Sequence, residues 1–128
     1  MIEIIKSFVL ISILIYFGFG ILLFIMQRNF MYMPTPVVEH SYDEEAYSND
    51  GETIKVVVVN RQKKNAILYF GGNMESVEYN AADFIEIFPD HAIFLVKYRG
   101  YGGSSGSPEE QAIYSDSFTQ RWSVSSIV

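Results

Sequence analysis

The sequence predicts an α/β fold in which an apolar N-terminal helix precedes a mostly parallel sheet. Three observations support this prediction: a stretch of 21 uncharged residues near the N-terminus, short apolar segments typical of buried strands, and an amphipathic segment between two of them. Short, fully apolar strands that alternate with helices indicate a parallel sheet covered on both faces. With 128 residues, the chain has room for one small domain.

The N-terminal segment 1–28 is predicted to be a membrane anchor. Residues from Ser7 to Gln27 have no charge and are bounded by Lys6 and Arg28. As a helix, this stretch would extend about 31 Å, close to the hydrocarbon thickness of a bilayer. A cleaved signal peptide is the main alternative, but its apolar core would be shorter and would end at small residues. We expect a single-pass signal-anchor with the N-terminus in the cytoplasm and the rest of the chain outside. The positive charge on the two flanks, on which the orientation depends, is nearly equal.

The remainder of the chain is acidic. From Arg28 to Val128 there are 8 basic and 14 acidic side chains, which account for the whole net charge of −6. Nucleic acid is not an expected partner, because phosphate binding requires clustered Lys and Arg. The sequence contains no Cys, which excludes a disulfide, a Cys-ligated metal site and thiol catalysis. We expect no cofactor and no metal.

Residues 29–46 are predicted to form a juxtamembrane linker. Pro34 and Pro36 favour extended backbone in the residues that precede them. Three adjacent carboxylates follow at 43–45. We expect these carboxylates in a solvated loop rather than in a metal site, because neighbouring side chains do not converge on one ion.

Segment 47–116 is predicted to be a partial α/β domain. Asn49-Asp50-Gly51 is typical of a hairpin turn. Apolar runs predict strands at 53–59, 66–70 and 92–96. Between the last two, apolar residues at helical spacing predict a helix over 77–88 that Pro89 ends.

The last segment, 117–128, has no clear pattern. Ser107 and Pro108, with Glu110 three residues after the Ser, are typical of a helix start. A helix that packs on a sheet should then repeat apolar residues at spacings of three and four, but the repeat stops after Tyr114. We therefore expect the patterned sequence to end near Asp116, as it would in a truncated or frameshifted chain.

Two loops follow apolar strands and are candidates for a functional site, because ligands of parallel sheets bind beyond the carboxyl ends of the strands. The first is Gly71-Gly72-Asn73-Met74, where the backbone N–H groups of Asn73 and Met74 are expected near a helix start. Such N–H groups stabilise an oxyanion or hold a phosphate. A plain tight connection is the alternative. The second loop extends from Arg99 to Ser107.

Within the second loop, Gly102-Gly103-Ser104-Ser105-Gly106 satisfies the G-x-S-x-G pattern of a serine-hydrolase nucleophile. A nucleophile turn follows directly on its strand, and its helix begins at once after the Ser. Here three residues intervene before Gly102, and the helix signals begin only at Ser107. We therefore interpret Ser104 as a decoy.

Together these segments resemble the N-terminal part of a membrane-anchored α/β-hydrolase. The resemblance extends from about residue 5 to about residue 116 and rests on the apolar anchor and three motifs: Tyr-Met-Pro-Thr-Pro at 32–36, Ile-Leu-Tyr-Phe-Gly-Gly-Asn at 67–73, and Tyr-Arg-Gly-Tyr-Gly-Gly-Ser-Ser-Gly-Ser-Pro at 98–108. It implies that Asn73, with Met74 beside it, donates to an oxyanion hole, in a loop where Gly71 replaces the more usual His. It also implies that the site is shaped by both loops, through Gly71, Gly72, Arg99, Gly100, Tyr101 and Gly102.

The remaining expectation concerns what the sequence lacks. A serine hydrolase of this type requires Ser, an acid and His, in that chain order. Downstream of Pro108 there is no His. His40 precedes the predicted sheet and His91 lies at a strand entry, so each is expected to be a surface or structural histidine. We assign no catalytic residue.

Two functions are consistent with these observations. The first is that of an N-terminal fragment of an esterase, lipase, thioesterase or peptidase, inactive alone. The alternative is a membrane-tethered interaction module, whose exposed sheet edge requires a complementing C-terminal fragment or a second copy.

Overall fold

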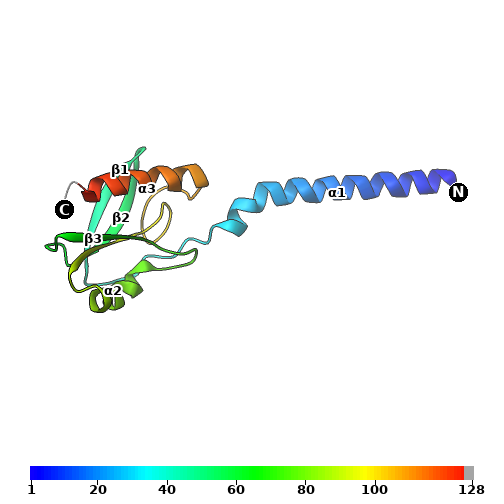
Figure 1. The fold of residues 1–128 in the computed structure, drawn as a ribbon. Coiled ribbons are helices and arrows are strands. Elements are labelled where there is room, and N and C mark those ends of the chain that lie inside the picture. Colours follow the sequence, from blue (N-terminus) through cyan, green and yellow to red (C-terminus); the bar gives the residue numbers. More distant parts are fainter. Residues whose placement is uncertain (126–128) are drawn as a thin grey trace. The chain divides into compact units, whose positions relative to one another are not determined.

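The computed structural model describes residues 1–125, which form two compact units, Met1–Tyr32 and the chain from Met33 onward. The first unit is a single helix, α1 (Ile2–Met31), drawn in blue in Figure 1. None of its residues is buried, and it is long and apolar enough to span a membrane. The helix extends three residues beyond the predicted anchor boundary at 28.

The second unit contains a sheet of four strands (Figure 1). The strands are β1 (Asp43–Asn49), β2 (Glu52–Val59), β3 (Asn65–Phe70) and β4 (His91–Val96), and their order in the sheet is β1-β2-β4-β3. Among the described residues, β3 and β4 form the one parallel pair. The β1–β2 and β2–β4 pairs are both antiparallel. The prediction of a mostly parallel sheet is therefore wrong, and the sheet is mixed.

The hairpin between β1 and β2 accounts for one of the two antiparallel pairs. Asp50 and Gly51 form a two-residue turn with φ values of 50° and 79°. Positive φ at both positions is the geometry of a type I′ turn, which joins antiparallel strands. The hairpin therefore places the carboxylates at 43–45 in strand β1, and the expectation that they lie in a solvated loop is wrong.

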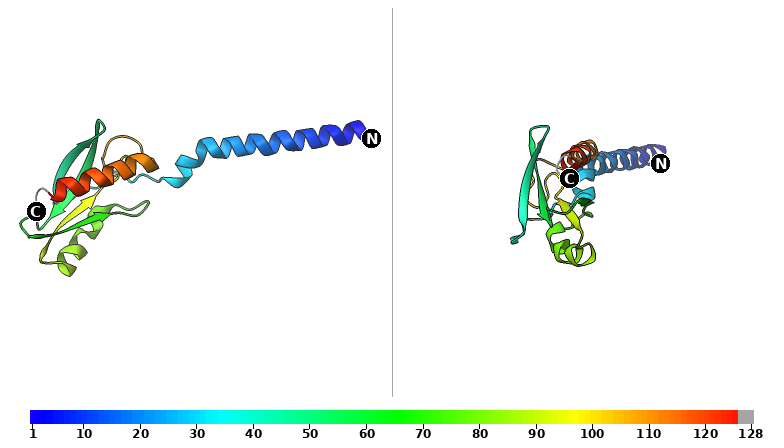
Figure 2. Two further views of the ribbon diagram at one scale, coloured as in Figure 1. Left: turned by 45° about the horizontal axis from the view of Figure 1, so that its top comes forward. Right: turned by 60° about the vertical axis from the view of Figure 1, so that its left-hand side comes forward.

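The sheet has an apolar core on each face. One core consists of Ile54, Val56, Val58, Ala92, Phe94 and Val96. The other consists of Val57, Val59, Val77, Ala81, Ile93 and Leu95. The helical segments η1 (Val77–Asn80) and α2 (Ala81–Ile87) cover the second core, and α3 (Glu110–Ser125) lies on the opposite side of the sheet (Figure 2).

The helix predicted over 77–88 is confirmed as η1 followed by α2. In contrast, α3 begins at Glu110, so Ser107 is not its N-terminal cap. The helix also continues beyond Asp116 into the segment expected to lack pattern, whose last residues, 126–128, lie outside the described residues. In this extension Gln120 is fully buried, and its side-chain amide has no hydrogen-bond partner in the described chain. A buried amide without a partner costs about 1–3 kcal/mol, so the α3 sequence is poorly matched to this packed position.

Candidate functional site

The loop after β3 is a tight turn with one strained residue. Glu75 donates its backbone N–H to the carbonyl of Gly72 at 3.3 Å, and Met74, inside this turn, has a φ of 64°. A non-glycine residue in this left-handed region costs on the order of 1–2 kcal/mol. The first helical residue after the turn is Val77. A turn therefore separates Asn73 and Met74 from η1, which begins three residues after Met74.

The side chain of Glu75 organises this loop. Its carboxylate accepts hydrogen bonds from the Gly72 backbone N–H, from the Tyr69 hydroxyl at 2.8 Å and from the Asn80 amide. Burial alone would raise the pKa of Glu75, but these three hydrogen bonds outweigh burial and lower it. The Glu75 carboxylate therefore holds the loop in place, and the Gly72 N–H already donates to this carboxylate.

Gly71 has a steric role in this arrangement. A Cβ at this position would lie 2.6 Å from Val77 Cγ1, a distance that side chains do not adopt. The position that the resemblance assigns to His is therefore closed to any side chain unless Val77 moves. Val77 belongs to the core under the sheet, so such a movement would disturb the packing of η1.

The structure brings the two predicted loops together. Tyr101 is buried, and its hydroxyl donates a hydrogen bond to Asn73 Oδ1 at 2.7 Å. The backbone N–H of Met33 lies 3.1 Å from both Asn73 Oδ1 and the Tyr101 oxygen. The Asn73 carboxamide oxygen thus joins the loop after β3, the loop after β4 and the segment that follows α1.

Arg99, which the resemblance assigns to the rim of a site, is held in an ion pair within the domain. Its guanidinium forms two hydrogen bonds to Asp116 on α3, Nε to Oδ2 at 3.0 Å and Nη2 to Oδ1 at 2.6 Å. These hydrogen bonds raise the pKa of Arg99. Asp116 also accepts a hydrogen bond from Asn49 Nδ2 at 2.8 Å, so the pair connects α3 to the β1–β2 hairpin.

Ser104 is part of the sheet rather than of a reactive site. Its Oγ accepts the backbone N–H of Lys55 and donates to the carbonyl of Lys97, each at 2.9 Å. Because Lys97 N–H also donates to the Lys55 carbonyl at 3.0 Å, the serine hydroxyl completes the hydrogen-bonding pair between two diverging strands. The side chain is 6% exposed. The geometry is that of a structural serine.

A cluster of charged residues lies on the α2 face, and the sequence analysis missed it. Lys97 Nζ is 2.7 Å from Glu78 Oε1 and 2.6 Å from Glu44 Oε2, and the Lys97 and Glu78 side chains are each 2% exposed. Lys55 pairs with Glu44 at 2.8 Å. Burial would raise the pKa of Glu44, but hydrogen bonds from Lys55 and Lys97 and their charges hold it at about 2. His40 borders this cluster, with Nε2 3.4 Å from Glu44.

His91 has a different environment. Its ring contacts Phe88 edge to face, with a centroid distance of 5.9 Å. The two histidines are therefore placed in a charged cluster and at a strand entry respectively. Within residues 1–125, the His, Asp and Glu side chains form no group of three or more that is arranged to hold a metal ion.

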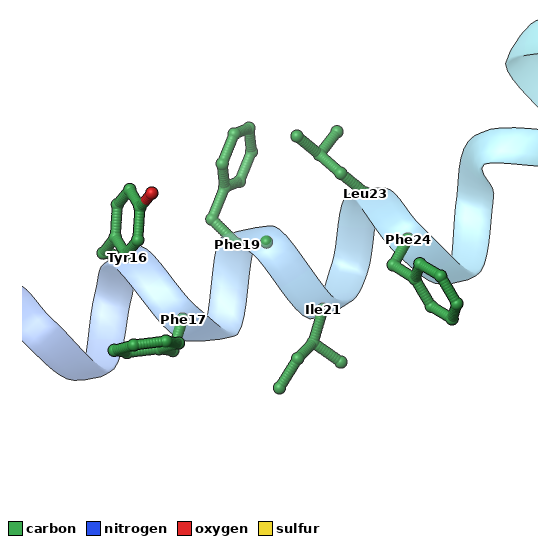
Figure 3. A pocket seen from close by; sticks show the side chains of 7 residues that line it. Tyr16, Phe17, Phe19, Ile21, Leu23 and Phe24 are labelled. Carbon is green, nitrogen blue, oxygen red and sulfur yellow. The ribbon is translucent and has the colours of Figure 1, made fainter.

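A hollow on α1 is of a different kind. It has a volume of about 510 Å³ and is lined by Tyr16, Phe17, Phe19, Gly20, Ile21, Leu23 and Phe24 (Figure 3). The hollow lies on the outside of a single helix, where the labelled side chains point away from the helix axis. It offers apolar contact to lipid chains or another helix, and the Tyr16 hydroxyl is the one polar side-chain group in its lining.

In the two loops, backbone N–H groups such as those of Met74, Gly103 and Gly106 remain available to an external acceptor, because no acceptor for them lies among the described residues. The Met74 side chain is 64% exposed. No family model matches the chain, and no solved structure matches it. The function is therefore argued from the geometry of the two loops.

Proposed function

We propose that this chain provides the membrane-anchored, oxyanion-side part of an α/β-hydrolase of the esterase, lipase, thioesterase or peptidase type, and that it does not hydrolyse esters alone. The observation on which this rests is the Met74 backbone N–H in the loop after the third strand, which has no acceptor within residues 1–125. In α/β-hydrolases one oxyanion donor comes from the loop after the third strand. Asn73 has a supporting role here, because its carboxamide holds Tyr101 and Met33.

The inactivity of the chain alone follows from three side chains. Ser104 is buried, and its hydroxyl is hydrogen-bonded to the backbone of Lys55 and Lys97. His40 lies at the Glu44 cluster and His91 contacts Phe88, and within residues 1–125 neither is hydrogen-bonded to a serine. Without a serine activated by His, an oxyanion donor contributes only a residual part of the rate enhancement.

Hydrolysis of an activated short-chain ester tests this proposal. The full chain, purified in detergent, should hydrolyse p-nitrophenyl butyrate at the rate of the buffer alone. It should also fail to react with a fluorophosphonate probe. The Ser104→Ala variant should behave identically, and Ser48→Ala, on the exposed β1 edge, serves as a matched control for handling. Turnover that disappears only in Ser104→Ala would overturn our interpretation of Ser104.

A complementation experiment tests the positive part of the proposal. The chain is co-refolded with a C-terminal hydrolase half that supplies the next strand, the nucleophile turn, the acid and His. We expect fluorophosphonate labelling that neither half shows alone. A stable complex of the two halves that remains unlabelled contradicts the proposal.

The second candidate function is that of a membrane-tethered interaction module, and the composition of β3 favours it. This strand forms an edge of the sheet and contains no charged residue or Pro that would block pairing with another strand. The partner would be a complementing C-terminal fragment or a second copy. Light scattering on the detergent-solubilised chain tests this function, because a protein mass of one chain across all concentrations contradicts self-association.

A further inference from the structure

Exposed apolar side chains gather where the segment after α1 meets the two loops. Met33, Val37 and Met74 are 42%, 65% and 64% exposed. Met33 is hydrogen-bonded to Asn73, the neighbour of Met74. Val37 lies beside the second loop, because its Cγ2 is 3.1 Å from the position that a Cβ on Gly103 would occupy. We call Met33, Val37 and Met74 the apolar rim.

The segment after α1 is bound to the second unit almost from its first residue. The N–H of Met33 is shared by Asn73 and Tyr101, and the N–H of Gly102 donates to the carbonyl of Thr35 at 3.0 Å. Only Tyr32 separates Met33 from the last residue of α1. Two residues extend at most about 7 Å, so Met33 stays within that distance of the helix end for any angle between the two units.

The length of α1 sets the depth of this helix end in a bilayer. The uncharged stretch stops at Gln27, and the helix continues for four residues to Met31, which adds about 6 Å. This length is close to the thickness of the headgroup layer on one side of a bilayer. When the uncharged stretch fills the hydrocarbon core, α1 therefore ends near the bilayer surface.

We propose that the apolar rim contacts the surface of the lipid bilayer that α1 spans, so that the two loops face the membrane. This inference rests on the part of the proposed function that makes α1 a membrane anchor, and it is independent of hydrolase ancestry. Lipid is the occupant because the short connection keeps Met33 close to the bilayer surface. The contact is apolar rather than electrostatic, since the chain after α1 has a net negative charge.

The strained conformation of Met74 supports a functional role for this side chain. Gly or Asn would occupy a φ of 64° at lower cost, yet this position has a long, flexible apolar side chain that is largely in solvent. Met adapts to irregular apolar surroundings, which suits contact with acyl chains and headgroups. Strain retained at an exposed position is typical of sites selected for contact with a ligand.

Site-directed spin labelling tests the contact, because the chain has no Cys of its own. Full-length Met74→Cys and Val37→Cys variants are labelled with a nitroxide and reconstituted in phosphatidylcholine vesicles. We expect both labels to be more accessible to oxygen than to a water-soluble nickel complex. Ile87→Cys is the matched control, since Ile87 is 66% exposed and ends α2, close to where β4 begins at the opposite end of the sheet. The label at Ile87 should be more accessible to the nickel complex than to oxygen, as expected for a residue in water.

A nitroxide label at Phe17→Cys, in the middle of α1, distinguishes failure of the membrane anchor from failure of the contact between the apolar rim and lipid. If Phe17 is in lipid while Met74 and Val37 resemble Ile87, the contact is disproved and the anchor stands. If Phe17 is in water, both the anchor and the contact are disproved. Spin–spin broadening at Met74 that unlabelled chain removes by dilution would mean that a second copy covers the rim, which also overturns the proposal. Circular dichroism confirms that each variant retains the parent fold.

Discussion

The two edges of the sheet differ in their charge. Strand β1 contains Asp43, Glu44 and Glu45, and the last two are ion-paired within the domain, Glu44 with Lys55 and Lys97 and Glu45 with Arg61. Strand β3, at the opposite edge, contains no charged side chain. Charged residues on an edge prevent pairing with further strands, whereas a continuous apolar strand is typical of a sheet interior. The comparison indicates that charged side chains disfavour the pairing of a further strand with β1, whereas the composition of β3 does not. We call β1 the closed edge and β3 the open edge of the sheet.

The largest expected effect comes from breaking the charged cluster beside β1. The Lys97→Met variant leaves Glu78 buried without its cation, and removal of one partner from a buried pair costs about 3–5 kcal/mol of the free energy of unfolding. Lys55→Met is the control, because Lys55 is 32% exposed and an exposed pair contributes about 1 kcal/mol or less. Urea denaturation monitored by circular dichroism measures both. Equal losses of the free energy of unfolding in the two variants would contradict the prediction, because they would show that the buried Glu78 carboxylate does not depend on Lys97.

The second prediction concerns the open edge. If the chain self-associates through β3, Ala66→Lys, which places a charge on the exposed start of this strand, should weaken the association by about tenfold, because a charged side chain on an edge strand disfavours pairing with another strand. Ala46→Lys on β1 is the control and should leave association unchanged. Analytical ultracentrifugation in detergent measures the association constant. Equal effects of the two substitutions would mean that β3 is not the associating edge.

The same contrast explains which elements the sequence could predict. Strands β3 and β4 were predictable because their apolar runs are intrinsic to the segments, and so was the turn at Asp50 and Gly51. Strand β1 was not, since acidic residues are depleted in strands and its stability comes from pairing with β2 and from distant cations. The fold class was therefore partly predictable, but the direction of the pairing was not.

The candidate site shows a similar limit. That the loops after β3 and β4 would lie at one edge follows from parallel pairing, which apolar strands suggest. The junction of Tyr101, Asn73 and Met33 joins residues up to 68 positions apart in sequence, and no local pattern specifies such a contact. The context of Ser104 argued against a nucleophile, but its burial and its role in joining β2 to β4 depend on backbone groups that the sequence does not reveal.

The third prediction uses pH to weaken the closed edge. The pKa of Glu44 is about 2 in the folded chain, below its ordinary value of 4.5, so its ion pairs stabilise the fold above pH 4.5. This contribution is lost as the pH falls from about 4.5 to 2, because the unfolded chain then binds the proton first. In Glu44→Gln, the free energy of unfolding should fall less over this interval than in the parent. Parallel acid titrations of the two proteins would contradict this assignment.

The smallest effect is expected in the turns that follow β2 and β3. These turns offer a second comparison between the two sides of the sheet. Asn60, after β2, and Met74, after β3, both have positive φ, 52° and 64°. Asn tolerates this conformation, but Met does not, so Met74→Gly should raise the free energy of unfolding by about 0.5 kcal/mol, the relief of strain less the entropy of glycine. Asn60→Gly should give no gain. If the apolar rim contacts lipid, Met74→Gly should also reduce the oxygen accessibility of a label at Val37, although the fold becomes more stable. A gain in stability with unchanged accessibility would assign the strain at Met74 to the turn alone.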